Sequence, residues 1–387
     1  MNKNGVEIEI FDTTLRDGAQ ALPYANQFPD GSKADIAHNI AQLGAGVIEA
    51  GFPATLGDRE EVRSVANTVG QTYYDVQVWG VQNEYSVART PVIAGLSRTT
   101  PSDIEATWEA VSNAVRPRIH TFVSTDPEHM RAKFPGKTPE DVLQMGREAV
   151  RLARSLSQCH YGASIEFSAE AASTTEPDYL ERVIKTAIEQ GADVINVPDT
   201  VGQRSPFWMK DFYGRVIDWV MQENPAVTIS AHNHNDLDQA TANTIGLVMA
   251  AADYSASNDV RVKVQLETAI GGLGERAGNA DVFPVVANLF KSMSDMSVPV
   301  RFEFNPSQAV RVARTVMDFA GLEVHRQSPI VGRDTNVHRS GIHSDGVIKG
   351  GHAIYTPHDP TFWGHESDAV HEDGKYQGKA GKRVAIS

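Results

Sequence analysis

Two histidines separated by one residue are the feature of this sequence with the clearest chemistry. His232 and His234 lie in SAHNHNDLD, residues 230–238, directly after an apolar run. Alternate side chains of a strand point to the same side, so both imidazoles should face one way. Such a pair suits a divalent cation, with Asn235 and Asp236 available to orient the rings. The pattern predicts a metal site for zinc, manganese, cobalt or magnesium.

A second group of reactive side chains lies near the N-terminus, in FDTTLRDGAQ, residues 11–20. Asp12, Arg16 and Asp17 place two carboxylates and one guanidinium in a single loop. Two imidazoles with the Asp17 carboxylate would leave coordination positions open for substrate oxygens, as a Lewis-acid site requires. Taken alone, the loop fits a solvated Arg–Asp pair equally well.

Two further segments end in polar residues. Ser168 and Glu170 close the strand-like IEFSAE, residues 165–170, where a carboxylate can face the end of a sheet. Asn279 closes the glycine-rich GGLGERAGN, residues 271–279, and is expected to open the helix that follows. The glycine spacing matches no phosphate-binding loop, so a tight turn is the simpler interpretation of that segment.

The elements that must position these residues follow an alternating pattern. Short β-rich runs alternate with amphipathic helical stretches over three quarters of the chain, which predicts a parallel α/β sheet. Eight such runs favour closure into a (β/α)₈ TIM barrel. A further β-like run at 76–81 leaves a nine-strand open sheet as the alternative. The eight runs are 7–11, 47–52, 92–96, 119–124, 164–168, 194–197, 227–231 and 262–268.

The alternation stops after Met293. Residues 294–306 read as an extended connector and 307–321 as a helix, and the remainder is rich in Gly, His and Asp. We therefore expect a TIM-barrel catalytic domain over 1–295, then a linker and a small, mainly helical C-terminal subdomain over 296–387. That subdomain has little core of its own, so a partner surface is expected to hold it in order.

Composition excludes several classes of protein. Lys and Arg number 35 against 49 Asp and Glu, a net charge of −14, which argues against a nucleic-acid or anionic-membrane surface. The single cysteine, Cys159, rules out an internal disulfide and fits a reducing compartment. With no long apolar run and no signal-peptide core, a cytoplasmic protein is expected.

Six motifs, taken together and in this order, resemble those of the DRE-TIM metallolyase superfamily and, within it, the 2-isopropylmalate synthases. The resemblance extends over about residues 7–382 and implies a TIM barrel that works with a bound metal. The motifs are FDTTLRDGAQ, VIEAGFPA (47–54), RIHTF (118–122), PDTVG (198–202), HNHND (232–236) and GERAGN (274–279).

The resemblance implies a role for each matching residue. It makes Asp17, His232 and His234 metal ligands, with Asn279 as an additional ligand. It gives Arg16 the task of polarising a 2-oxo acid and stabilising oxyanion charge. The residues implied to hold the 2-oxo acid or contact the reacting groups are Glu49, His120, Ser168, Thr200 and the catalytic carboxylate Glu170.

The C-terminal part of the chain also resembles the 2-isopropylmalate synthases. SGIHSDG, residues 340–346, places His343 at the catalytic histidine of the family, and Tyr355 corresponds to the tyrosine that accompanies it. In relatives these two residues reach the active site of the partner subunit, so a homodimer is implied. The unperturbed pKa of a histidine near neutral pH makes His343 the better candidate for the base.

The implied reaction is an acyltransferase condensation of acetyl-CoA, the co-substrate, with 3-methyl-2-oxobutanoate and water. It yields 2-isopropylmalate and CoA, a step of leucine biosynthesis, and a monovalent cation is a further candidate cofactor. Alternatives within the superfamily are citramalate synthesis or use of another 2-oxo acid. Alternatives of other classes are a metal-dependent hydrolase and a catalytically silent paralogue that binds a metal and a 2-oxo acid.

Some positions depart from the family pattern. Asp238 stands where the residue after the histidines is usually Gly, and Gly271 where synthases often have Asn. The chain also stops at Ser387, without the further domain through which leucine inhibits typical members. We therefore expect no leucine feedback in this polypeptide.

Overall fold

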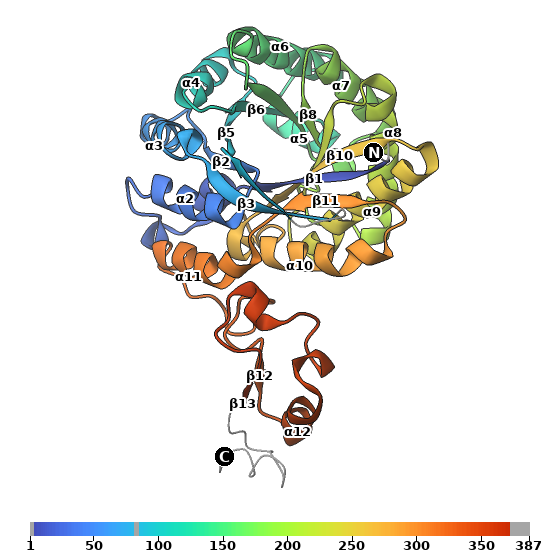
Figure 1. Cartoon of the computed structure of the whole chain (residues 1–387). Helices are drawn as coiled ribbons and strands as arrows, with labels where there is room; N and C mark the ends of the chain where they lie inside the picture. The colour runs from blue at the N-terminus through green and yellow to red at the C-terminus, as the bar shows by residue number, and fades with distance from the viewer. Residues whose placement is uncertain (1–3, 81–84, 372–387) are drawn as a thin grey trace.

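The barrel is closed. The computed structural model describes residues 4–80 and 85–371, and its central sheet is a ring of eight parallel strands (Figure 1). The last strand of the ring pairs with the first in register from Gly5 opposite Arg261 to Asp12 opposite Thr268. This confirms the predicted (β/α)₈ barrel and excludes the nine-strand open sheet. The strands are β1 (Gly5–Asp12), β2 (Val47–Gly51), β5 (Val92–Arg98), β6 (Pro117–Ser124), β7 (Ser164–Glu170), β8 (Val194–Asn196), β9 (Thr228–His232) and β10 (Arg261–Thr268).

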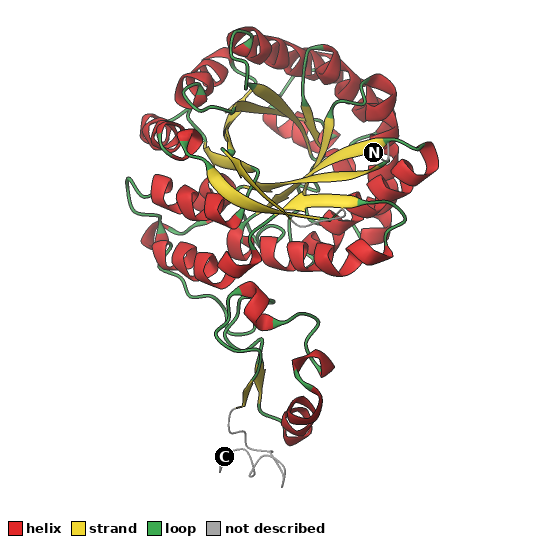
Figure 2. Ribbon diagram, in the orientation of Figure 1, coloured by secondary structure: helices red, strands yellow, loops and turns green. Residues whose placement is uncertain are grey.

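Helices surround this ring and bury their apolar faces against it (Figure 2). Thr138 and Asp141 form the expected capping box at the start of α6, since each side chain satisfies a backbone N–H that the helix leaves free. In the part of the chain that is described, no helix is long and apolar enough to cross a bilayer. The barrel helices are α2 (Lys33–Leu43), α3 (Leu56–Asn67), α4 (Pro101–Val111), α5 (Pro127–Lys133), α6 (Pro139–Ser157), α7 (Pro177–Glu189), α8 (Pro206–Glu223), α9 (Ala240–Asn258) and α10 (Val282–Ser292).

The β-like run at 76–81 lies outside the ring. It forms β3 (Tyr74–Trp79), which pairs antiparallel with β4 (Tyr85–Arg89), while Val81 falls outside the described residues. On its other side β3 pairs with β11 (Val300–Glu303), which lies within the predicted connector and runs beside β1. The connector therefore attaches a small antiparallel extension to the N-terminal half of β1.

The C-terminal part leaves the barrel after α11 (Ala309–Phe319), the helix predicted at 307–321, which packs against α2. Trp363 is buried in an aromatic cluster with Phe290 and Phe304 and anchors the following segment. Beyond that anchor, α12 (Gly341–Gly350) and the two-residue strands β12 (Val337–His338) and β13 (Val370–His371) project away from the barrel (Figure 1). Residues 372–387 of the predicted subdomain lie outside the described residues.

Short helical turns complete the chain. A π-helical turn, η1, follows β1 directly, and the three-residue α1 extends it. Their bounds are η1 (Thr14–Gly18), α1 (Ala19–Ala21), η2 (Tyr24–Asn26), η3 (Val69–Gln71), η4 (Ala172–Thr174), η5 (Ile270–Gly272), η6 (Met293–Asp295), η7 (Pro306–Gln308), η8 (His352–Ile354) and η9 (Pro360–Trp363).

Candidate metal centre

The turn η1 sets the positions of Arg16 and Asp17. The N–H of Gly18 donates to the carbonyl of Thr13, the wide bonding pattern of a π turn, which is frequent at functional sites. The guanidinium of Arg16 then donates to two carboxylates, Asp17 Oδ1 and Glu49 Oε2, each at 2.6 Å. Arg16 thus joins the first loop to β2, and its planar fork is held between two anions.

Asp17 lies close to His232 and His234 at the C-terminal mouth of the barrel. His232 ends β9, and His234 follows it in a bridge with Asn279. The two Nε2 atoms are 3.3 Å apart, and one potential ligand atom from each of the three side chains lies within 4.8 Å of the others. All three residues are buried. The structure therefore brings together the three side chains that the sequence pattern selected.

The free atoms of this cluster fit a bound cation. Asn279 Nδ2 donates to Asp17 Oδ2 at 2.7 Å, while Asn279 Oδ1 and His234 Nδ1 are buried with no hydrogen-bond partner in the described structure. A Cβ at Gly274 would lie 2.9 Å from Asp17 Oδ2, so only glycine lets this loop pass so close. A buried acceptor without a partner is costly, and coordination of a cation would satisfy Asn279 Oδ1.

The electrostatics of the cluster favour the protonation states that a metal needs. Burial lowers the pKa of His232 to about 4 and that of His234 to about 3, so both rings are neutral at neutral pH. Burial opposes ionisation of Asp17, but Arg16 and the two histidines outweigh it and lower the pKa of Asp17 to about 2. One carboxylate and two neutral imidazoles are thus ready to bind a divalent cation.

A carboxylate that the sequence analysis did not select orients the first imidazole. Glu267, on β10, lies 2.9 Å from His232 Nδ1 and accepts its hydrogen bond, which leaves Nε2 free. Asn235 and Asp236 do not have this role, contrary to expectation. Asn235 accepts from the N–H of Ala240, and Asp236 pairs with Arg276. The sequence contained a pattern that could have identified Glu267. Polar residues alternate along its strand at Lys263, Gln265 and Glu267, and alternate residues of a strand share one face.

A second set of hydrogen bonds surrounds His120. Its Nδ1 lies 2.7 Å from Glu49 Oε1 and its Nε2 lies 2.6 Å from Ser168 Oγ. Asn196, which the sequence analysis also missed, donates to the same serine at 2.8 Å. Burial opposes a charged ring, but the carboxylates of Glu166 and Glu49 outweigh it and raise the pKa of His120. Glu49 therefore links His120 to Arg16, and its pKa is lowered by Arg16 and His120 in spite of burial.

A cavity of about 390 Å³ lies at the C-terminal mouth and is lined by most of these residues, though not by Glu49 or Asn279. Glu170 lies at its edge, where both carboxylate oxygens accept from Lys133 Nζ on α5, at 2.6 and 2.7 Å. Thr200 also lines the cavity, and its hydroxyl accepts from the N–H of Ala171. The lining residues are Arg16, Asp17, Gln20, Phe52, Leu96, Arg98, His120, Phe122, Ser168, Glu170, Asn196, Pro198, Thr200, His232, His234, Glu267, Glu275 and Arg276.

His343 and Tyr355 lie elsewhere in the same chain. Their rings stack with centroids 3.9 Å apart and planes at 6°, on the projecting C-terminal segment. Neither residue is among those that line the cavity. The structure therefore brings these two predicted residues to each other, but not to the metal cluster of their own chain.

Residues 279, 238 and 271 have backbone conformations that bear on the expectations from the sequence. Asn279 does not open a helix, because α10 begins at Val282 with Asp281 as its N-cap. Asp238 has a φ of 57°, and Gly271 has a φ of 61°. Both lie in the left-handed region that glycine adopts most easily, which is a physical reason for the glycine that the family resemblance led us to expect at position 238.

Comparison with known proteins places this geometry in a family. The family model described as HMGL-like matches residues 7–316. Two similar proteins are the 2-isopropylmalate synthase of Prochlorococcus marinus (strain MIT 9215) and the chloroplastic 2-isopropylmalate synthase 2 of Arabidopsis thaliana. Each is 39% identical and aligns with 90% of this chain. The aligned part is 59% of the first protein and 51% of the second, so the chain spans only part of their length.

Solved structures share the fold at lower identity. An HMG-CoA lyase from Acinetobacter baumannii, in complex with coenzyme A and 3-methylmalate, superposes with a TM-score of 0.61 at 18% identity. That match covers 87% of this chain and 98% of the lyase. The carboxyl transferase domain of Rhizobium etli pyruvate carboxylase, with pyruvate, gives 0.54 at 15% identity, with 82% and 48% coverage.

Proposed function

The chain belongs to the HMGL-like family, and from this premise we propose that it is a metal-dependent enzyme that condenses acetyl-CoA with a 2-oxo acid. The proposed substrate is 3-methyl-2-oxobutanoate, and the products are 2-isopropylmalate and CoA. The observation that carries the proposal is the buried cluster of Asp17, His232 and His234, with the free Oδ1 of Asn279 beside it. The 39% identity to proteins named 2-isopropylmalate synthase supports the substrate.

The metal ligands in this proposal are Asp17, His232 and His234, with Asn279 as an additional ligand. A divalent cation held there would polarise the ketone of the 2-oxo acid. Arg16 lies beside Asp17, and its fixed guanidinium would stabilise negative charge on the former ketone oxygen. Because Glu49 and Asp17 already hold the guanidinium, little reorganisation is needed as that charge develops.

The remaining cavity residues would hold the substrates. We assign the 2-oxo acid carboxylate to the hydroxyls of Ser168 and Thr200 and to His120, whose Nε2 would exchange its contact with Ser168 for one with the substrate. Leu96 and Phe122 line the same cavity and would contact the isopropyl group. A methyl or methylene contact of this kind discriminates by only about 1–3 kcal/mol, so pyruvate is the alternative substrate.

Proton removal from the acetyl methyl group is assigned to His343 of the partner subunit, assisted by Tyr355 of the partner subunit. The acetyl methyl carbon then bonds to the ketone carbon, and the ketone oxygen becomes a hydroxyl. Water cleaves the thioester, leaving a carboxylate and free CoA. Glu170 would contact the reacting groups as the catalytic carboxylate, in the ion pair with Lys133 that keeps it at the mouth.

The test is thiol release from acetyl-CoA by the metal-loaded full chain, measured with a panel of 2-oxo acids. Release that is fastest with 3-methyl-2-oxobutanoate supports the proposal, and release fastest with pyruvate supports citramalate synthesis. Bound metal without release for any 2-oxo acid would instead indicate a catalytically silent binding protein.

A matched pair of variants tests the metal site in the same assay. His232→Ala should lose both bound metal and thiol release while keeping its folded circular dichroism spectrum. His38→Ala, an exposed histidine outside the cavity, should keep both. An active His232→Ala protein without metal would refute the assignment.

A further inference from the structure

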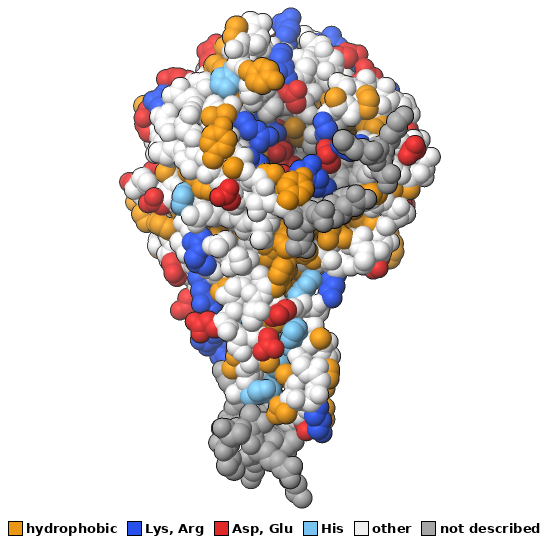
Figure 3. Space-filling view, in the orientation of Figure 1, with side chains coloured by type: hydrophobic (Ala, Val, Ile, Leu, Met, Phe, Trp, Pro, Cys, Tyr) orange, Lys and Arg blue, Asp and Glu red, His pale blue; other side chains and the backbone are white. Residues whose placement is uncertain are grey.

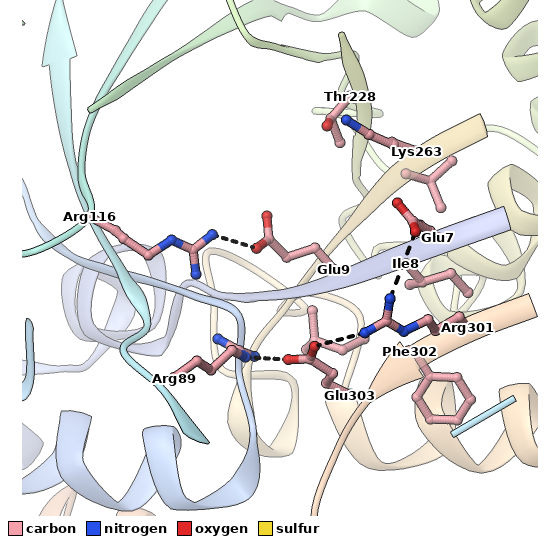
Figure 4. A pocket seen from close by; sticks show the side chains of 12 residues that line it. Glu7, Ile8, Glu9, Arg89, Arg116, Thr228, Lys263, Arg301, Phe302 and Glu303 are labelled. Atoms are coloured by element: carbon pink, nitrogen blue, oxygen red, sulfur yellow. Dashed lines mark hydrogen bonds and ion pairs between the residues drawn. The ribbon is translucent and has the colours of Figure 1, made fainter. Parts of the chain in front are cut away.

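A second charged cavity lies at the opposite mouth of the barrel. It has a volume of about 280 Å³ and is formed by the N-terminal halves of β1 and β10, the start of β9, and residues of β4 and β11 (Figure 4). Figure 3 shows basic and acidic side chains gathered around a hollow over the barrel on this face. The metal cluster lies at the C-terminal strand ends, so this cavity is a separate site.

Cations outnumber carboxylates in the lining of this cavity. The chain as a whole carries a net charge of −14, so a local excess of positive charge runs against the overall composition. Such a pocket concentrates anions, because its walls have a low dielectric constant and focus the field. The cations are Arg89, Arg116, Lys263 and Arg301, and the carboxylates are Glu7, Glu9 and Glu303.

The carboxylates neutralise these cations unequally. Arg89 is paired directly with Glu303. Glu9 lies 3.7 Å from a guanidinium nitrogen of Arg116 and also 3.7 Å from one of Arg118, so one carboxylate faces two cations beyond hydrogen-bond distance. No ion pair or hydrogen bond of the Lys263 side chain is found within residues 4–80 and 85–371, although its strand neighbour in register is Glu7. Arg301 faces two carboxylates, since it lies 3.9 Å from Glu7 and 3.9 Å from Glu303. Arg116 shares one carboxylate with Arg118 and donates to the carbonyl of Thr90 at 3.2 Å. Arg116 and Lys263 are therefore less neutralised by carboxylates than Arg89 and Arg301.

The surroundings of Arg116 also indicate that positive charge in this cavity is incompletely neutralised. In Figure 4 Arg116 and Lys263 lie on opposite sides of Glu9, and Thr228 lies beside Lys263. Burial lowers the pKa of Arg116, and the nearby guanidinium groups of Arg89 and Arg118 lower it further, while Glu9 opposes them. The cavity thus holds crowded positive charge that a bound anion would relieve.

We propose that this N-terminal mouth is a binding site for a small oxyanion, a phosphate or a carboxylate, held between Arg116 and Lys263. Guanidinium and ammonium groups form strong charge-assisted hydrogen bonds with such oxygens. The hydroxyl of Thr228 supplies a further donor from the same wall. The volume admits an anion of a few non-hydrogen atoms and its remaining water.

The test uses the full chain with its metal bound, and inorganic phosphate and malonate as separate probes at constant ionic strength. The rate at which an acylating reagent modifies Lys263 is measured by peptide mass spectrometry, with exposed Lys137 as the reference. Saturating anion should slow modification of Lys263 about tenfold and leave Lys137 unchanged, because a charge-assisted hydrogen bond is worth about one order of magnitude. Protection by phosphate alone, or by malonate alone, identifies which of the two oxyanions the site takes.

Two variants of single lining residues provide a second test of the site. Titration calorimetry should show affinity reduced about tenfold in Lys263→Gln and increased in Glu9→Gln, which removes a competing negative charge. Arg98→Gln, which removes a cation from the other mouth, should leave protection of Lys263 intact. Unchanged modification of Lys263 at saturating anion would overturn the proposal. Equal affinity in Lys263→Gln, Glu9→Gln and the unmodified chain would also overturn it, since the anion would then bind elsewhere.

Discussion

At the scale of single residues, Glu267 sets the orientation of the His232 imidazole in the candidate metal centre. Its carboxylate accepts from Nδ1 and so leaves the Nε2 lone pair for a cation. Ser230 donates to the other carboxylate oxygen at 3.0 Å, and Gln265 donates to that serine at 2.9 Å. The imidazole is therefore oriented by a chain of hydrogen bonds that runs inside the barrel.

Glu267→Gln tests this orientation. The amide keeps the shape of the side chain but removes the negative charge that fixes the ring, so metal affinity should fall about 10- to 100-fold. The measurement is competition with a metal chelator, followed by metal analysis. Glu275→Gln, at the rim of the same cavity, is the control and should bind metal like the unmodified chain. Unchanged affinity in Glu267→Gln would show that the packing of the ring alone holds it.

The two metal-site histidines also make a pH prediction for the metal-free protein. Their pKa values of about 4 and about 3 in the folded state lie below the unfolded value of about 6.5. The unfolded chain therefore binds protons first, and the free energy of unfolding should fall as the pH decreases from about 6.5 to about 3. For His232 the loss is of order 3 kcal/mol. Urea unfolding at several pH values should show a shallower slope for His232→Asn, whereas His38→Asn should keep the original slope.

At the scale of elements, helix α5 positions Lys133 for its ion pair with Glu170. Its N-cap is Asp126, whose carboxylate accepts from the N–H groups of Glu128 and His129 at 2.9 and 3.0 Å. In Figure 1 this helix lies across the far mouth of the barrel. A short helix depends strongly on its cap, so the position of Lys133 depends on Asp126 as well.

Asp126→Ala should therefore lower the free energy of unfolding by about 1 kcal/mol. It should also slow the proposed thiol release, because Lys133 no longer holds Glu170 in place. Thr138→Ala is a matched control, since it removes the capping box of α6 at a similar cost in stability without touching the Lys133–Glu170 pair. Equal rates in the two variants would argue that α5 has no part in the reaction.

At the scale of the whole molecule, His343 and Tyr355 are separated from the metal cluster of their own chain. The segment that carries them also exposes apolar side chains, among them Ile342 at 78% and Ile348 at 59%. Apolar groups gathered on a projecting segment are typical of a surface that contacts another chain. These features support the proposed homodimer, in which the segment reaches the partner's barrel.

Complementation tests this arrangement. His232→Ala and His343→Ala should each be inactive alone. If each active site uses His343 of the partner subunit, unfolding and refolding an equal mixture should restore about a quarter of the original activity, since half of the dimers are hybrid and each has one intact site. The readout is thiol release before and after mixing. Failure to recover activity, with hybrid dimers shown by native mass spectrometry, would place both residues in the same site.

The sequence could predict those features that depend on local pattern. Alternating strand and helix runs predicted all eight strands of the ring, and the His-x-His spacing predicted that His232 and His234 share one side of a strand. The position of the run at 76–81 remained ambiguous. Its alternation of apolar and polar residues indicates a strand, but the same alternation is expected for a strand inside the ring and for one outside it. Only its pairing with β11, more than two hundred residues later, placed it outside the ring.

The sequence by itself determined the barrel and the family, and it was enough to predict candidate metal ligands. Hydrophobic periodicity and the order of motifs are properties of the linear sequence and can be recognised without a structure. Only the tertiary structure decided which polar groups meet inside the barrel. It brought Glu267 into hydrogen-bond contact with His232 and Lys133 into an ion pair with Glu170. It also brought Arg116 and Arg118 to either side of one carboxylate, that of Glu9. The physical reason is that closure of the sheet brings together side chains from strands far apart in sequence, and the energies of charges and hydrogen bonds depend on those distances.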